Sequence, residues 1–185
     1  SGYAEMLKHG LISNTAHWAE LLNFNTSDID YTALKQLVGR SVQVKEDIVE
    51  QDPFEHGIRK ALNLGHTVGH AFESMALAEN RPVLHGYAVA WGIVCELYLS
   101  HLKVGFPKEK MRQTIQFIKD NYGVFTFDCK KYEQLYAFMT HDKKNTSGTI
   151  NFTLLKDIGD IRINQIADKD TIFEMLDFYR ECMGI

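Results

Sequence analysis

The stretch ALNLGHTVGHAFE, residues 61–73, places two histidines, His66 and His70, four residues apart in a run that otherwise suits burial. On a helix, this spacing brings both imidazoles onto one face, where they can converge on a metal ion. The motif is HTVGH rather than HExxH, and no acidic residue lies between the two histidines. The pair alone is therefore compatible with metal binding, with catalysis or with packing in a core.

The residues before this pair predict the helix that would carry it. Asp52, Pro53 and Glu55 fit the N-cap, first and third positions of a helix. We therefore expect one continuous helix over about residues 53–78. On this interpretation Glu55 completes a capping box, and a role in a site is the alternative.

Polar side chains share one face of this predicted helix, and small residues share another. The polar residues fall within about 60° of arc if each residue turns by about 100°. They are Arg59, Asn63, His66 and His70. The small residues are Gly57, Ala61, Gly65 and Gly69. A glycine inside a helix costs about 1 kcal/mol relative to alanine, so we expect another backbone to approach the small face closely.

Three other segments carry residues that could take part in chemistry. His85, in VLHGYAVAWG, stands where a loop meets a buried helix and could point into a cleft. Glu5 and Lys8 share a helical face in AEMLK, and a surface ion pair is the alternative. Lys143 and Lys144 lie together in HDKKNTSG, and a solvated turn is the alternative to a role in a site.

The rest of the chain predicts a single, mainly α, bundle-like domain with one small β-hairpin. Apolar residues recur at helical spacing in most segments, whereas β-branched residues alternate on either side of KDIGD. Beside the helix over 53–78, the expected helices cover about residues 3–12, 30–51, 85–102, 108–123, 130–144 and 170–182. The expected hairpin lies within residues 149–167. We find no repeat or linker that would divide residues 1–185.

Composition narrows the class of protein. The net charge of −4 and the lack of a lysine or arginine block argue against nucleic-acid binding. The chain has no apolar run of about 18 residues, so a membrane span is not expected. Cys95, Cys129 and Cys182 are widely spaced, which favours reduced thiols in the core of a cytoplasmic protein.

Four blocks in the sequence carry a resemblance to a known family. They are GYAEMLKHG, KEDIVEQDPFEHGIRKALNLGHTVGHAFE, LHGYAVAWG and HDKKNTSGTINFTLL with the following DIG. Together, and in this order, they resemble the C-terminal helical domain of the 3-dehydroquinate synthase family, from residue 2 to about residue 160. Within them, RxxLNxGHTxGHAxE is highly specific to that family. One departure is Tyr87, where the family more commonly has glutamate.

The resemblance implies a metal site and a substrate site. It assigns the metal to Glu5, His66 and His85, and two imidazoles with one carboxylate form the ligand set of an open catalytic zinc site. Zinc or cobalt is the expected ion, and the same donors also suit Fe(II). The residues implied in substrate binding or catalysis are Lys8, Lys45, Glu55, Arg59, Asn63, His70, Lys143 and Lys144. His66 and His70 would thus have different functions.

The resemblance also implies a reaction, the NAD-dependent closure of DAHP, a seven-carbon keto sugar phosphate, into 3-dehydroquinate in the shikimate pathway. The cations would hold the phosphate and carboxylate of DAHP. No strand followed by a glycine-rich phosphate loop occurs in the chain, so we expect the NAD-binding domain to lie outside it. The isolated chain should then be inactive, and the complete protein a homodimer.

Three alternatives remain at this point. Another sugar-phosphate cyclase or a metal-dependent polyol dehydrogenase would share the architecture. A polyol dehydrogenase would have little use for so many phosphate-binding cations. A helical metal-storage bundle would also place histidine and glutamate on helices, but it would need repeated ExxH pairs.

Overall fold

The computed structural model describes residues 1–141 and 149–185, so Lys143 and Lys144 lie outside the described residues. The α-helices are α1 (Gly2–Ser13), α2 (Thr15–Asn23), α3 (Tyr31–Gln51), α4 (His66–Ala78), α5 (His85–Val104), α6 (Lys108–Tyr122), α7 (Tyr132–Thr140) and α8 (Lys169–Met183). Two 3-10 helices, η1 (Ile58–Asn63) and η2 (Cys129–Lys131), and two strands, β1 (Asn151–Asp157) and β2 (Asp160–Ile166), complete the described elements. The prediction of a mainly α domain with one hairpin is confirmed.

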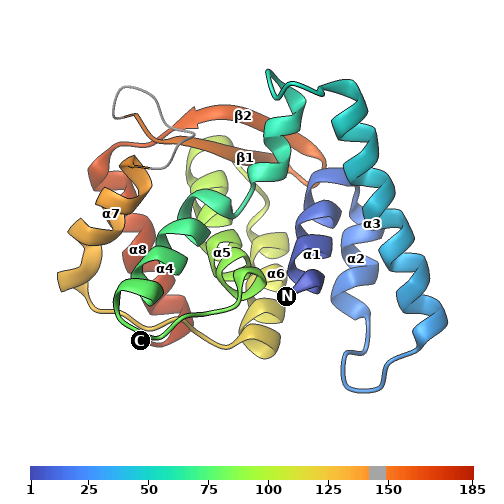
Figure 1. The fold of residues 1–185 in the computed structure, drawn as a ribbon, viewed down its shortest axis with the longest axis horizontal. Coiled ribbons are helices and arrows are strands. Elements are labelled where there is room, and N and C mark those ends of the chain that lie inside the picture. The colour runs from blue at the N-terminus through green and yellow to red at the C-terminus, as the bar shows by residue number, and fades with distance from the viewer. Residues whose placement is uncertain (142–148) are drawn as a thin grey trace.

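Helix α5 is the centre of the bundle (Figure 1). Its residues are buried on nearly every side, as its continuous apolar sequence predicts. Helices α1, α2 and α3 lie to one side of it, and α4, α7 and α8 lie to the other (Figure 1). Of the elements that carry candidate residues, α1 and α4 pack directly against α5.

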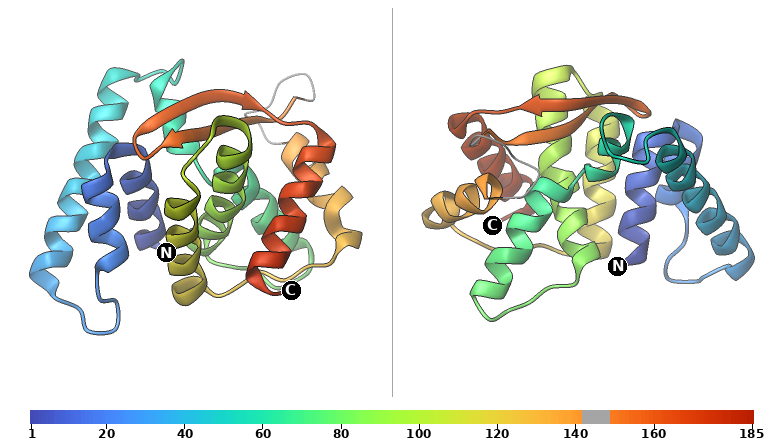
Figure 2. Two further views of the ribbon diagram at one scale, coloured as in Figure 1. Left: turned by 180° about the vertical axis from the view of Figure 1, so that it is seen from behind. Right: turned by 45° about the horizontal axis from the view of Figure 1, so that its top comes forward.

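The β-hairpin crosses one end of the helices, as both views in Figure 2 show. Strands β1 and β2 pair in antiparallel register and turn at Gly159, which has a positive φ of 77°. The backbone N–H of Gly159 donates to the Leu11 carbonyl of α1 at 2.9 Å. The N–H of Leu155 donates to Ser100 Oγ of α5 at 3.0 Å. The hairpin thereby ties α1 to α5.

Helix α2 is the one described α-helix for which the sequence patterns make no prediction. It begins where the side chain of Asn14 accepts a hydrogen bond from the backbone N–H of His17 at 2.9 Å. This N-cap satisfies one of the N–H groups that a helix start leaves without an intrahelical partner. The short break at Asn14 allows α2 to turn away from α1 and pack beside it.

The predicted continuous helix over residues 53–78 is wrong. After α3 the chain forms a loop, then η1, a turn and finally α4. Glu55 in the loop has φ of 58° and Gly65 in the turn has φ of 81°, and neither value is compatible with an α-helix. The four polar residues from Arg59 to His70 therefore do not form one helical face, because two elements carry them.

Asp52 explains this error, since it caps the end of one element rather than the start of another. It is the C-cap residue of α3. Its carboxylate accepts hydrogen bonds from the backbone N–H groups of His56 at 2.9 Å, Gly57 at 2.7 Å and Arg59 at 3.0 Å. The aspartate thus satisfies the donors of a compact loop, and Glu55 is not part of a capping box.

The expected close approach of another backbone is confirmed for the C-terminal part of the small-residue set. A Cβ added to Gly69 of α4 would lie 3.0 Å from the Ala88 carbonyl oxygen of α5. The continuous stripe from Gly57 is wrong, because no single helix carries it. Close packing is therefore concentrated where α4 crosses α5.

The structure also tests two expectations that were drawn from composition, the lack of a membrane span and the core position of the cysteines. Among the described residues, no helix is long and apolar enough to cross a membrane. The three thiols are not all core residues: Cys95 is buried and Cys182 is half-buried, but Cys129 is exposed. The expectation of a core position is wrong for Cys129, which lies at the start of η2, on the surface.

Candidate functional site

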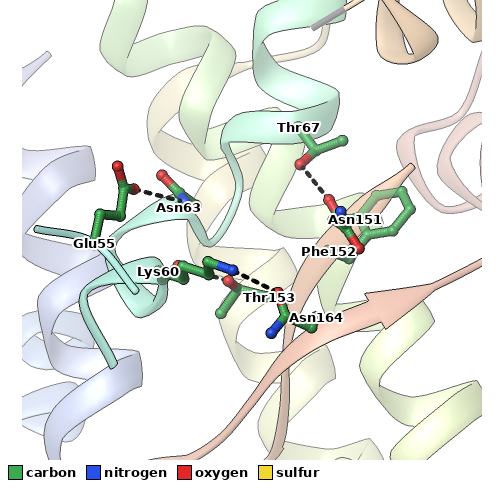
Figure 3. A pocket seen from close by; sticks show the side chains of 8 residues that line it. All are labelled: Glu55, Lys60, Asn63, Thr67, Asn151, Phe152, Thr153 and Asn164. Atoms are coloured by element: carbon green, nitrogen blue, oxygen red, sulfur yellow. Dashed lines mark hydrogen bonds between the residues drawn. The ribbon is translucent and has the colours of Figure 1, made fainter. Parts of the chain in front are cut away.

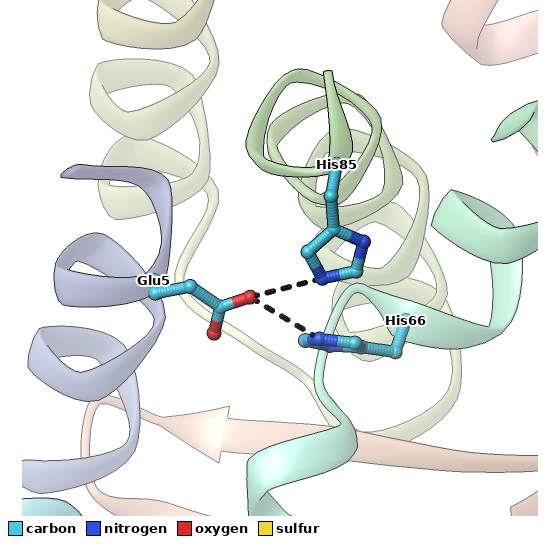
Figure 4. Close-up of side chains that lie close together, drawn as sticks. All are labelled: Glu5, His66 and His85. Atoms are coloured by element: carbon cyan, nitrogen blue, oxygen red, sulfur yellow. Dashed lines mark ion pairs between the residues drawn. The ribbon is translucent and has the colours of Figure 1, made fainter. Parts of the chain in front are cut away.

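Three helix starts bring Glu5, His66 and His85 together (Figure 4). Glu5 lies in the first turn of α1, while His66 and His85 are the first residues of α4 and α5. The Nε2 atom of His66 lies 3.3 Å from Glu5 Oε1, and that of His85 lies 3.4 Å from the same oxygen. One carboxylate and two imidazoles therefore converge on one point from three separate segments.

The spacing of these three donors fits a bound metal ion. Nitrogen and oxygen ligands lie about 2.0–2.2 Å from zinc, so two of them at a tetrahedral angle are about 3.3–3.6 Å apart. The two distances from Glu5 Oε1, 3.3 Å and 3.4 Å, fall in that interval. The donor set leaves at least one position of a tetrahedron open, which is typical of a catalytic rather than a structural site.

The second ring nitrogen of each histidine also faces an acceptor. Nδ1 of His66 lies 3.0 Å from the Leu64 carbonyl oxygen, and Nδ1 of His85 lies 2.8 Å from Glu73 Oε1. With the proton on Nδ1, each ring directs the lone pair of Nε2 toward Glu5. Metal-binding histidines are commonly oriented by such a partner on the other nitrogen.

A cation would resolve a conflict at His66. Burial, the largest influence, lowers the pKa of His66, although the Glu5 carboxylate opposes this effect. The ring is therefore neutral near pH 7 and carries one N–H, but its two nitrogens face two acceptors, the Leu64 carbonyl and Glu5. Either tautomer leaves one nitrogen lone pair against an acceptor oxygen. A positive ion between Nε2 and Glu5 removes that repulsion.

Lys8 and Glu5 form an ion pair directly beside these donors. The Nζ atom of Lys8 lies 2.5 Å from Glu5 Oε2, and the lysine is buried. Burial by itself would raise the pKa of the Glu5 carboxyl, but the interaction with His66 and the charge of Lys8 outweigh it. The pKa of Glu5 consequently lies well below its usual range, so the carboxylate is available as an anionic ligand.

His70 lies one helical turn after His66 on α4 and belongs to a different group of donors. Its ring centroid is 5.5 Å from that of His66 and 6.0 Å from that of His85. With Glu73 and His85, it forms a second set whose ligand atoms lie within 4.8 Å of one another. Sequence reasoning missed Glu73, although its place three residues after His70 was visible in GHAFE.

Two other predicted residues, Glu55 and Asn63, line a cavity of about 370 Å³ beside the hairpin (Figure 3). Asn63 Nδ2 donates to Glu55 Oε1 at 3.3 Å. On the far wall, Thr67 Oγ1 donates to the Asn151 carbonyl at 3.2 Å. The cavity thus joins the loop after α3 to the start of α4, one residue beyond His66.

Lys45 and Arg59 do not belong to either group of candidate metal donors. Lys45 on α3 lines a groove of about 860 Å³ between α1 and α3, and Glu5 lines the same groove. Arg59 at the start of η1 donates from Nη1 to the Pro53 carbonyl at 2.7 Å. Lys45 therefore shares an open space with a metal-ligand candidate, while Arg59 supports the loop that carries Glu55.

Tyr87, which stands where the family more commonly has glutamate, lies in an aromatic cluster. Its ring centroid is 5.0 Å from that of Tyr122 and 6.0 Å from that of Trp91, and both pairs meet edge to face. Tyr87 is not a member of either donor group. Its bulk is therefore used in packing α5 against α6.

Comparison with known proteins identifies the family. The family model described as 3-dehydroquinate synthase C-terminal matches residues 2–145. The chain is 60% identical over 185 residues to the 3-dehydroquinate synthase of Parabacteroides distasonis, covering all of this chain and 52% of that protein. It is 41% identical over 170 residues to the 3-dehydroquinate synthase of Leptospira interrogans, covering 88% of this chain and 46% of that protein. The chain therefore spans about half the length of these curated relatives.

Solved structures show the same fold at lower identity. A 2-epi-5-epi-valiolone synthase from Streptomyces hygroscopicus, solved with NAD+ and Zn2+, aligns with a TM-score of 0.79 at 20% identity, over 98% of this chain and 51% of that one. A 2-deoxy-scyllo-inosose synthase, complexed with carbaglucose-6-phosphate, NAD+ and Co2+, aligns with a TM-score of 0.75 at 20% identity, over 97% of this chain and 50% of that one. Because the family model matches most of this chain, the chain belongs to the 3-dehydroquinate synthase family and corresponds to the C-terminal domain of that family.

Proposed function

We propose that this chain is the metal- and substrate-binding part of an enzyme that converts DAHP into 3-dehydroquinate and phosphate. The observation that carries the proposal is the convergence of Glu5, His66 and His85, with both histidine Nε2 atoms directed at one carboxylate oxygen. The names of the relatives at 60% and 41% identity support the reaction. NAD would be bound mainly by the part of the complete protein that lies outside this chain.

The donors Glu5, His66 and His85 are proposed to hold one divalent ion, zinc or cobalt. Two nitrogen donors and one carboxylate suit either ion, and structural neighbours were solved with Zn2+ and with Co2+. Such an ion would supply Lewis-acid polarisation of a substrate hydroxyl that is being oxidised. Glu73 and the Leu64 carbonyl would hold the two imidazoles in the orientation that the ion needs.

The other predicted residues would bind and orient the substrate. Cationic side chains would neutralise the phosphate and the carboxylate of DAHP. They are Lys8, Lys45, Arg59 and one of Lys143 and Lys144. Asn63 would contact a hydroxyl group, with its amide oriented by Glu55. His70, one turn from His66, would transfer a proton or stabilise charge on the substrate.

Further expectations about the complete protein remain predictions. We propose a cytoplasmic homodimer, and we expect the isolated 185-residue chain to be inactive because the site for NAD would be missing. A different sugar-phosphate cyclase is the second candidate, since both solved neighbours bear such names. The identity of 20% to those neighbours, against 60% to a 3-dehydroquinate synthase, favours the first proposal.

The test is an assay of the complete protein with DAHP, NAD+ and Zn2+ or Co2+. We expect one phosphate released for each 3-dehydroquinate formed, loss of activity after treatment with a chelator, and recovery when the metal is added back. Turnover of another sugar phosphate but not of DAHP would select the second candidate. Turnover by the isolated chain with added NAD+ would contradict the proposed division of the site between two domains.

A further inference from the structure

The start of α4 is unusual because the residue before His66 cannot cap it. Gly65 is the N-cap residue and has no side chain. The first N–H groups of a helix lack intrahelical partners and require acceptors from elsewhere. Here Glu96 of α5 accepts hydrogen bonds from two of these N–H groups. Its Oε1 accepts from the Gly65 N–H at 3.0 Å, and its Oε2 accepts from the Val68 N–H at 3.1 Å. These two N–H groups lie on either side of His66 in the sequence.

Glu96 is fully buried, with 0% of its surface exposed. A buried carboxylate is stable only where hydrogen bonds and local charge compensate the loss of water. The two N–H bonds and the positive end of the α4 dipole provide that compensation. The position of the carboxylate and the position of the α4 start are therefore coupled. The sequence alone shows Glu96 only as an interruption of an apolar run.

Gly92 reinforces this coupling one turn earlier on α5. A Cβ at Gly92 would lie 2.0 Å from the Gly65 carbonyl oxygen and 2.7 Å from the Gly69 backbone nitrogen. The two helix backbones are thus in direct contact, with no room for a methyl group. Gly65 is held through its N–H by Glu96 and against its carbonyl by Gly92, so a shift of the α4 start along α5 would break these contacts.

We propose that Gly92 and Glu96 form a clamp that sets the position of His66 relative to His85. His85 is the first residue of α5 and His66 is the first residue of α4. A contact that fixes these two helices against each other also fixes the separation of the two imidazoles. Glu96 is accordingly a positioning residue for the metal site, acting through the backbone of α4. This inference rests on the proposed function, because it requires a metal ion at the donors.

The experiment compares Glu96→Gln with Ser100→Ala in the complete protein. Glu96→Gln keeps the side-chain size but removes the charge and directs an amide N–H₂ at a backbone N–H. Ser100 is the matched control: it is equally buried, lies one turn further along α5, and accepts from the Leu155 N–H of the hairpin rather than from α4. Its hydroxyl also donates to the backbone carbonyl of Glu96 at 2.7 Å, so its removal leaves the Glu96 carboxylate and the two N–H groups of α4 in place. The measurements are Co2+ affinity by competition with a chelator, the visible absorption spectrum of bound Co2+, and thermal stability.

We expect Glu96→Gln to bind Co2+ about 10–100-fold more weakly, the usual cost of disturbing groups that orient metal ligands, and to show an altered Co2+ spectrum. Ser100→Ala should lower the thermal stability but leave affinity and spectrum unchanged. Glu96→Asp is a second variant that keeps the charge and shortens the side chain by one methylene, and it should bind more weakly than the wild type.

Three results would overturn the inference. Unchanged affinity in Glu96→Gln, together with a loss of stability like that of Ser100→Ala, would limit Glu96 to a role in folding. An equal loss of affinity in both variants would reflect general destabilisation. If the wild-type protein bound no Co2+ or Zn2+, the proposed metal site itself would fail, and that failure is distinguishable because it precedes any variant.

Discussion

The two sides of the site are built differently. On one side, α4 and α5 touch through their backbones and carry the two histidine donors. On the other side, residues of α1 and α3 line an open groove of about 860 Å³, and Val38 and Val42 of α3 are 42% and 47% exposed. This second side carries Glu5 and Lys45.

The two sides therefore position their side chains in different ways, one by close packing of helix backbones and the other by ion pairs and hydrogen bonds. The histidines are carried by two helices in direct backbone contact, which suits a metal with strict ligand geometry. Glu5 is held by its ion pair with Lys8, and the neighbouring His9 is held by a 2.5 Å hydrogen bond between its Nδ1 and Ser41 Oγ of α3. Variants on the α4–α5 side therefore test the two histidine donors of the metal site, while the stability that His9 contributes on the α1–α3 side should depend on pH.

His66→Ala should have the largest effect. The change removes one of three donors, so metal affinity should fall by more than the roughly 100-fold upper cost of losing an orienting partner, and turnover should be lost with the metal. The measurement is the metal content of the purified complete protein after dialysis against a weak chelator. Stoichiometric metal in this variant would show that His66 is not a ligand.

His70→Ala should separate catalysis from metal binding. His70 lies outside the group that contains Glu5, so metal content should remain near that of the wild type. Turnover of DAHP should fall by about 10²–10⁴-fold, the usual contribution of a group that handles protons or charge. Metal loss equal to that of His66→Ala would mean that His70 also chelates, through its group with Glu73 and His85.

His9 tests the α1–α3 side. Burial, and then the charge of Lys8, lowers the pKa of His9 to about 4, from about 6.5 in an unfolded chain. The folded state therefore binds the proton more weakly than the unfolded state. The stability that comes from this difference is present above about pH 6.5 and is lost as the pH falls toward 4. The charged and titratable groups near His9 are Glu5, Lys8, His17 and Lys45.

Urea unfolding of wild type and His9→Gln between pH 7 and pH 4 measures this contribution. Across that range, the free energy of unfolding of the wild type should fall by at most about 3 kcal/mol more than that of the variant. Replacing the exposed His56 with glutamine controls for the loss of a surface histidine. Parallel curves for wild type and His9→Gln would exclude His9 as the source.

Glu73→Ala should have the smallest of these effects. It removes the acceptor for Nδ1 of His85 but no predicted ligand, so metal affinity should fall about 10–100-fold. Glu73→Gln keeps an acceptor oxygen, so its metal affinity should fall by less than that of Glu73→Ala. Metal affinity measured by competition with a chelator distinguishes the two, and an unchanged affinity in Glu73→Ala would show that packing alone orients His85.

Local patterns in the sequence were enough to predict most of the fold. Helical spacing of apolar residues predicted α3, α5, α6 and α8, and alternating β-branched residues predicted the hairpin around Gly159. These predictions succeed because each element buries its own repeating face. The family resemblance, rather than spacing alone, named Glu5, His66 and His85 as candidate donors, and the structure brings these three side chains together.

The tertiary structure decided which polar group meets which. Asp52 has the residue type of a helix N-cap, but its hydrogen bonds go to a loop, because α3 ends there and three loop N–H groups need an acceptor. Glu73 meets His85 twelve residues away, and Glu96 meets Gly65 across 31 residues. Spacing along one element cannot identify such partners, since a polar side chain binds whichever complementary group the packing of distant helices brings within reach.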